Sequence, residues 1–62
     1  MDEEKQGYIV EFLVVGKSVK VTAIDPATLR EATIIGSPLL PRRMLAKHAV
    51  RKLEFMMNKS GA

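Results

Sequence analysis

Two turn signals divide the first two thirds of this 62-residue chain into three segments of strand-forming residues. Gly16-Lys17 has the length of a two-residue hairpin loop, in which Gly supplies a positive φ. Asp25-Pro26-Ala27-Thr28 places Asp and Pro at the first two positions of a type I turn. The flanking segments are rich in β-branched residues, so we expect strands at about 8–15, 18–24 and 30–35.

The two turns independently select the same face of the expected sheet. A two-residue loop at 16–17 pairs Phe12 with Val21, and a four-residue loop at 26–29 pairs Val21 with Ile34. One face then contains only apolar residues, namely Val10, Phe12, Val14, Val19, Val21, Ala23, Ala32 and Ile34. A slip of one residue would break this agreement. We therefore predict an antiparallel sheet of three strands, and the short connections favour a simple meander.

After Pro41 the apolar residues follow the period of a helix instead. At about 100° per residue one apolar sector contains Leu45, Ala46, Ala49, Val50, Leu53, Met56 and Met57. We expect a helix from Pro41, which suits a first turn, to about Asn58. The predicted fold class is α+β, a three-stranded antiparallel sheet (β-β-β-α) with one C-terminal helix packed on one face. A single domain is expected at 7–59, with a disordered tail at 1–6 and a frayed end at 60–62.

The composition offers little for catalysis or metal binding. The chain has no cysteine and one histidine, His48, whose helical neighbours are Met44, Lys47, Arg51 and Lys52. No carboxylate or hydroxyl is therefore placed to orient the imidazole. We expect no enzyme activity and no metal or other cofactor. The longest apolar run has four residues and the N-terminus is acidic, so we expect a cytoplasmic protein without a membrane partner.

Two groups of apolar residues remain after the core is assigned. The first lies on the sheet face away from the helix, and the second on the outer side of the helix. They form the candidate self-association or partner surface: Ile9, Leu13, Val15, Ile24, Ile35, Met44 and Phe55. Because a chain this small often needs a second subunit to complete its core, we expect a homodimer. Stacked sheet faces and paired strand edges both remain open, and Phe55 belongs either to an interface or to the rim of the core.

The charge is unevenly distributed along the chain. Residues 1–36 hold four basic and six acidic side chains, a net charge of −2, whereas residues 37–62 hold six basic and one acidic, a net charge of +5. The candidate contacts to an anion or a nucleic acid are Arg42, Arg43, Lys47 and Arg51. The alternative is a solvated helix face whose cations suit the helix dipole.

Three stretches resemble a small family of bacterial proteins, chiefly alphaproteobacterial, that is classed as a domain of unknown function. They are V-E-F-L-V-V-G-K-S-V-K-V-T-A-I-D-P-A-T, I-I-G and A-x-R-K-L-E-F, and the resemblance covers about residues 7–55. It implies a bacterial cytoplasmic β-β-β-α domain and transfers no activity, ligand or site. The family has Gly where this chain has Leu29, so we expect a wider turn here.

The sequence thus predicts a small, non-catalytic, homodimeric module that binds another protein, whose identity it leaves open. The alternative is a nucleic-acid-binding module that uses the basic helix.

Overall fold

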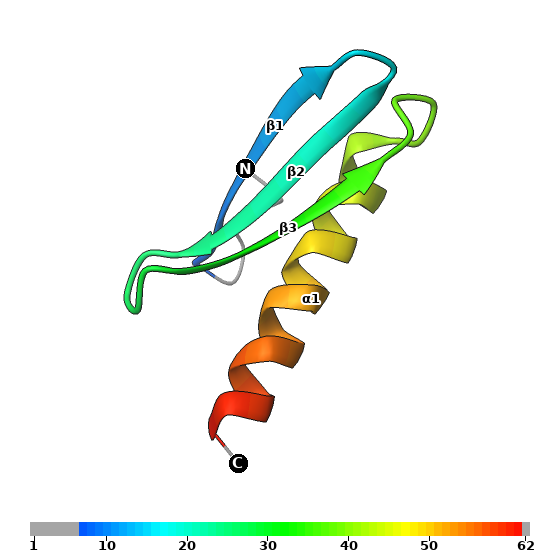
Figure 1. Ribbon diagram of the computed structural model, residues 1–62. Helices are drawn as coiled ribbons and strands as arrows, with labels where there is room; N and C mark the ends of the chain where they lie inside the picture. The colour runs from blue at the N-terminus through cyan, green and yellow to red at the C-terminus, as the bar shows by residue number, and fades with distance from the viewer. Residues whose placement is uncertain (1–6, 62) are drawn as a thin grey trace.

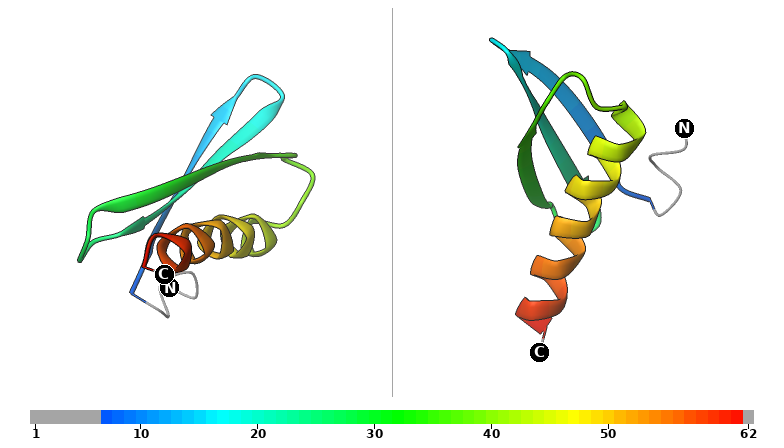
Figure 2. Two further views of the ribbon diagram at one scale, coloured as in Figure 1. Left: turned by 60° about the horizontal axis from the view of Figure 1, so that its bottom comes forward. Right: turned by 90° about the vertical axis from the view of Figure 1, so that its right-hand side faces the viewer.

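The protein consists of one small sheet covered on one side by one helix (Figures 1 and 2). The computed structural model describes the backbone of residues 7–61 and the side chains of residues 7–58. The elements are β1 (Ile9–Val15), β2 (Ser18–Asp25), β3 (Arg30–Gly36) and α1 (Arg42–Gly61). The strands form an antiparallel meander in the order β1-β2-β3. This confirms the predicted fold class, whereas the tail expected at 1–6 lies outside the described residues.

The predicted register is present along both strand pairs. Phe12 lies opposite Val21 and Val21 lies opposite Ile34, as the two loop lengths required. Gly16 has a φ of 60°, and Lys17 is not among the residues with positive φ. This combination fits a type II′ turn, which matches the twist of the strands that it joins.

The turn between β2 and β3 is built around Asp25. Its Oδ1 accepts a hydrogen bond from the Ala27 N–H at 2.9 Å, and its carbonyl accepts one from the Leu29 N–H at 2.7 Å. The loop keeps four residues, because Leu29 itself takes the left-handed conformation with φ of 64°. The expectation of a wider turn without Gly was therefore wrong, and the β-carbon of Leu29 carries the steric cost instead.

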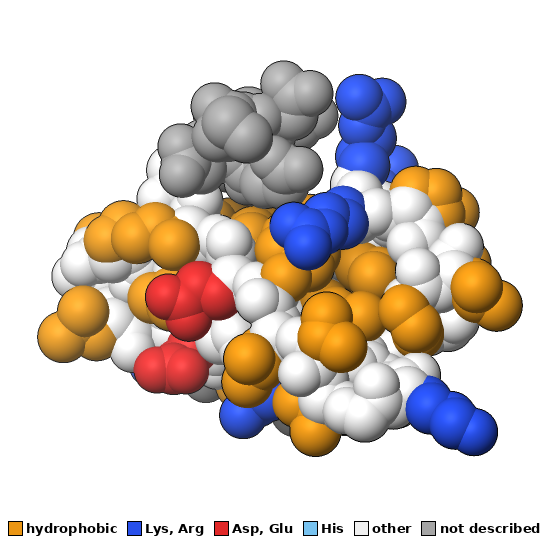
Figure 3. All heavy atoms as spheres, turned by 90° about the horizontal axis from the view of Figure 1, so that it is seen from above, with side chains coloured by type: hydrophobic (Ala, Val, Ile, Leu, Met, Phe, Trp, Pro, Cys, Tyr) orange, Lys and Arg blue, Asp and Glu red, His pale blue; other side chains and the backbone are white. Residues whose placement is uncertain are grey.

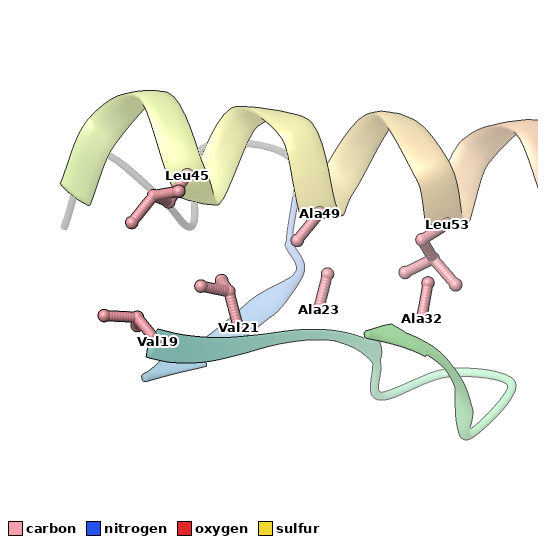
Figure 4. Packing of buried hydrophobic residues seen from close by; sticks show 7 residues of the cluster. All are labelled: Val19, Val21, Ala23, Ala32, Leu45, Ala49 and Leu53. Carbon is pink, nitrogen blue, oxygen red and sulfur yellow. The ribbon is translucent and has the colours of Figure 1, made fainter. Parts of the chain in front are cut away.

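The core lies between α1 and the two strands β2 and β3 (Figure 4). Leu45, Ala49 and Leu53 point from the helix toward the sheet. They meet four buried side chains of β2 and β3, namely Val19, Val21, Ala23 and Ala32. The small side chains under the middle of the helix allow its backbone to approach the sheet closely. The largest fully buried side chains are Leu45, Leu53 and Val21.

The helix covers less of the sheet than the apolar pattern suggested. It packs mainly on β2 and β3 and reaches β1 at few points. Val14, expected in the core, is consequently 63% exposed. Met56, also expected to face the sheet, is exposed as well. It lies one turn after Lys52, whose ammonium group reaches the outer edge of β3, so this flank of the helix projects beyond the sheet.

The ends of the helix also differ from the prediction. Pro41 precedes the helix, and its carbonyl accepts hydrogen bonds from the N–H groups of Met44 and Leu45. It therefore occupies the N-cap position, where the first helical hydrogen bond is accepted. At the other end the helix continues through Gly61, because the residues after Asn58 contain no proline that would stop it.

Gly36 fixes how closely the helix approaches the end of β3. A β-carbon built there would collide with the side chain of Leu45, which is itself buried. We predict that Gly36→Ala lowers the free energy of unfolding by about 1–3 kcal/mol, as overpacking does. Urea denaturation followed by circular dichroism measures this loss. Leu45→Ala should cost less in the Gly36→Ala background than in the wild type, and strictly additive losses would contradict the proposed collision.

Candidate self-association surface

Strand β1 exposes apolar side chains on both faces of the sheet. Ile9, Leu13 and Val15 lie on the face without a helix, and all three are exposed. On the other face Val14 is exposed, while Val10 and Phe12 are partly buried against the core. The strand is at the edge of the sheet and lies largely outside the cover of the helix. An exposed, apolar edge strand is a surface on which another strand can pair.

The open face of the sheet is less uniform than its apolar residues suggested. Leu13 and Ile35, 59% and 66% exposed, lie in one cross-strand row with Lys20 between them. In the next row the hydroxyl groups of Thr22 and Thr33 form a hydrogen bond of 3.1 Å. Ile24, half-buried, lies beyond that polar row and pairs with Ile9. Polar groups, including the exposed Glu11 between Ile9 and Leu13 on β1, thus divide the apolar residues that the sequence assigned to this face.

The two edges of the sheet differ in whether their outward backbone N–H and C=O groups are available to a further strand. In a two-residue hairpin the residues flanking the loop, here Val15 and Ser18, form a hydrogen-bonded pair, and such pairs alternate along the strands. The N–H and C=O groups of Val10, Phe12 and Val14 therefore point away from β2. On the opposite edge, the Thr33 carbonyl accepts a hydrogen bond of 2.7 Å from the Lys52 ammonium group. The helix thus occupies part of the β3 edge, whereas it makes little contact with β1.

Arg42, one of the candidate contacts to an anion or a nucleic acid, lies against β1. Its guanidinium carbon lies 4.9 Å from the centre of the Phe12 ring. A cation over an aromatic face at this distance stabilises by about 0.5–1 kcal/mol when exposed. This contact joins the first turn of α1 to the middle of β1.

Tyr8 joins the other end of β1 to the helix. It packs against the core cluster. Burial raises its pKa above the usual 10.0, and the negative charges of Glu54 and Asp25 add to the shift. Glu54 of the helix is half-buried and lies near this phenol.

The outer side of α1 carries the remaining residues singled out in the sequence. Phe55 is 65% exposed, so it does not reach the rim of the core, and Met44 and His48 are exposed on the same side. Arg43, Lys47 and Arg51 follow each other at intervals of four residues and are all exposed, so they form one row along the helix. Met44 and Phe55 are therefore separate from the apolar residues of β1.

Several exposed apolar side chains were not predicted from the sequence, among them Val14 and Leu39. Val14 was assigned to the core, and Leu39, in the loop before the helix, was not assigned to any surface. Leu39 is 92% exposed, although its N–H donates to the Ser37 hydroxyl at 3.1 Å. Figure 3, which views the molecule from above, shows hydrophobic side chains in several groups with basic side chains among them. The periodicity of apolar residues gives no information on Leu39, because this residue lies in the loop between β3 and α1 and has neither the period of a strand nor that of a helix.

Residues 7–58 include no group of three His, Asp or Glu side chains that could hold a metal ion. No helix within the described range is both long and apolar enough to cross a membrane. Each buried side-chain nitrogen and oxygen described has a hydrogen-bond partner.

The fold and its surfaces define a small α+β domain with one helix on a three-stranded meander. The chain belongs to the family described as Domain of unknown function (DUF6898), whose model matches residues 5–60. No curated protein and no solved structure shows a significant match to the chain. The resemblance to a domain of unknown function that the sequence indicated is thus confirmed.

The single tyrosine of the chain makes the environment of Tyr8 measurable. We predict that its phenol titrates with a midpoint above 10.0 when followed by tyrosinate absorbance. Glu54→Gln should lower this midpoint, because it removes one of the nearby negative charges.

The raised pKa of Tyr8 also makes the stability of the fold depend on pH. A folded-state pKa above that of the unfolded chain means that the folded protein binds the proton more tightly. The contribution is therefore fully present below the unfolded pKa and is lost as the pH rises through the folded pKa. Tyr8→Phe should remove the loss of folding stability that the phenol causes at high pH. A tyrosinate titration of the wild type with an unshifted midpoint would contradict the proposed environment of Tyr8.

Proposed function

We propose that the protein is a small, non-catalytic module that forms a homodimer through β1 and presents the assembled dimer to another protein. The observation that carries this proposal is the exposure of Ile9, Leu13 and Val15 on one face of β1 and of Val14 on the other. In a domain of this size a second subunit is a common way to complete the core. The non-catalytic role is supported by the exposed position of His48, on the outer side of α1 among Met44, Lys47, Arg51 and Lys52.

We further propose that this role is carried out in the bacterial cytoplasm. The chain contains no cysteine, so its stability does not depend on the oxidising compartments in which disulfides persist. The resemblance to alphaproteobacterial sequences supports the same assignment.

The oligomeric state tests the proposal directly. Light scattering on a sizing column should give a mass near twice the 6.9 kDa of the chain. Leu13→Glu should shift the mass toward that of the monomer, because it places a charge where the proposed interface has an apolar side chain. Leu39→Glu makes the same chemical change at an exposed loop position and should leave the dimer intact. A monomeric wild type, or an unchanged mass for Leu13→Glu, would contradict self-association through β1.

Nucleic-acid binding by α1 is the second candidate function. The observation in its favour is the exposed row formed by Arg43, Lys47 and Arg51 in the segment with a net charge of +5. Neutralising phosphates with such a row would give an affinity that falls steeply with salt concentration.

This candidate predicts a clear mutational pattern in a fluorescence-anisotropy titration with labelled duplex DNA and duplex RNA. Replacing Lys47 and Arg51 together by Glu should weaken binding at least tenfold at low salt. Lys20→Glu reverses a charge on the opposite side of the molecule and should have a much smaller effect. The absence of binding to either duplex at low salt would rule the candidate out.

A further inference from the structure

We infer that the partner of β1 is a second copy of β1, paired antiparallel so that Phe12 of the two chains lie opposite each other on a two-fold axis. This inference rests on the proposed self-association and specifies its geometry. The sequence left two modes of dimerisation open, stacked sheet faces and paired strand edges. The inference selects pairing of strand edges and specifies both the strand, β1, and its register.

The hydrogen-bonding groups available on β1 limit the pairing. Val10, Phe12 and Val14 direct their N–H and C=O groups away from β2, so only these residues can form hydrogen-bonded pairs across the new interface. They are spaced symmetrically about Phe12, which is also the central residue of Ile9–Val15. A two-fold axis at Phe12 therefore pairs Val10 with Val14 of the second copy and lets all seven residues of each strand overlap.

The neighbouring symmetric registers are less favourable. Moving the axis to Glu11 places two Glu11 carboxylates directly opposite each other in a close, non-hydrogen-bonded pair, which is destabilising. Moving it to Leu13 places Ile9 and Val10 opposite the Gly16-Lys17 turn and shortens the paired segment. With the axis at Phe12, Glu11 lies opposite Leu13 of the second copy, and no two like charges are paired.

The exposed side chains of β1 gain cover in this arrangement. On the helix-covered face, Val14 would lie beside Val10 of the second copy, and the two Phe12 rings would lie side by side. On the open face, Ile9 would lie beside Val15 of the second copy. An axis perpendicular to the sheet keeps both helices on the same side of a six-stranded sheet.

The second copy is favoured over a strand from another protein because β1 matches itself. The outward backbone groups repeat about one central residue, and so do the apolar positions except at Glu11, which is opposite Leu13. An isologous interface uses such self-complementarity. The opposite edge is a poorer choice, since Lys52 already binds the Thr33 carbonyl there.

The substitution Val14→Pro tests whether the edge of β1 pairs with a second copy, and it removes no hydrogen bond within the subunit. The Val14 N–H points away from β2, and proline is tolerated on an edge strand in that situation. Val14→Pro should keep the far-ultraviolet circular dichroism of the fold but reduce the mass on the sizing column to that of the monomer. Val14→Ala keeps the N–H and should remain dimeric. A folded, dimeric Val14→Pro would overturn edge pairing while leaving self-association itself intact.

Disulfide trapping tests the register and uses the natural lack of cysteine. Residues opposite each other in a non-hydrogen-bonded antiparallel pair have Cα atoms about 4.5 Å apart, within the range that a disulfide bridges. An equimolar mixture of Glu11→Cys and Leu13→Cys chains should therefore form a covalent dimer under mild oxidation. Either variant alone should form far less, because identical residues are then diagonal to each other.

Each outcome of the trapping experiment has a distinct meaning. Efficient cross-linking of Glu11→Cys alone would place the axis at Glu11, and that of Leu13→Cys alone would place it at Leu13; either overturns the Phe12 register. A dimeric wild type whose mixed variants do not cross-link would overturn β1 pairing in favour of another interface. A monomeric wild type would instead overturn the proposed self-association from which this inference starts.

Discussion

The width of one helix constrains everything else in this small structure. A helix with its side chains is about 10 Å across, and neighbouring strands are about 4.8 Å apart. One helix can therefore cover two strands fully but not three. Residues 7–61, whose backbone the structure describes, form three strands and a single helix. One strand must therefore remain largely outside the core, and in this protein it is β1.

The identity of the uncovered strand follows from where the small residues lie. Ala23 lies opposite Ala49 and Ala32 lies opposite Leu53 (Figure 4), and Gly36 lies against the side chain of Leu45. These positions on β2 and β3 let the helix backbone come close to the sheet. The corresponding side chains of β1 are larger, so the helix contacts that strand only at its flank. Packing of small side chains at the centre thus determines which strand remains available to a partner.

Much of the fold could be predicted because two loop lengths and the two-residue period of the strands supported the same register. The pairing of Phe12 with Val21 and of Val21 with Ile34 follows from counting alone. The lateral position of the helix could not be predicted in this way. The period identifies the face on which a side chain lies but not how far the covering element extends, and for that reason Val14 and Met56 were wrongly assigned to the core.

The candidate surface was predictable only in part for a related reason. Ile9, Leu13 and Val15 were found because β1 is apolar on both faces. The positions of Lys20 and of the threonine pair on the open face follow from the same predicted register, and the structure adds the hydrogen bond between the two hydroxyl groups. The difference between the two edges depends on backbone direction and on the Lys52 side chain, and neither is visible in a hydropathy pattern.

The hydrogen bond from Lys52 to Thr33 bears on how large an assembly can become. A subunit with two equally receptive edges could join copies at both, and each addition would expose a new receptive edge, as in a growing fibril. A subunit with one receptive edge stops after a single addition, because joining two such edges leaves none. For the proposed dimer, the contact of Lys52 with the β3 edge would therefore favour a closed pair over an open-ended polymer.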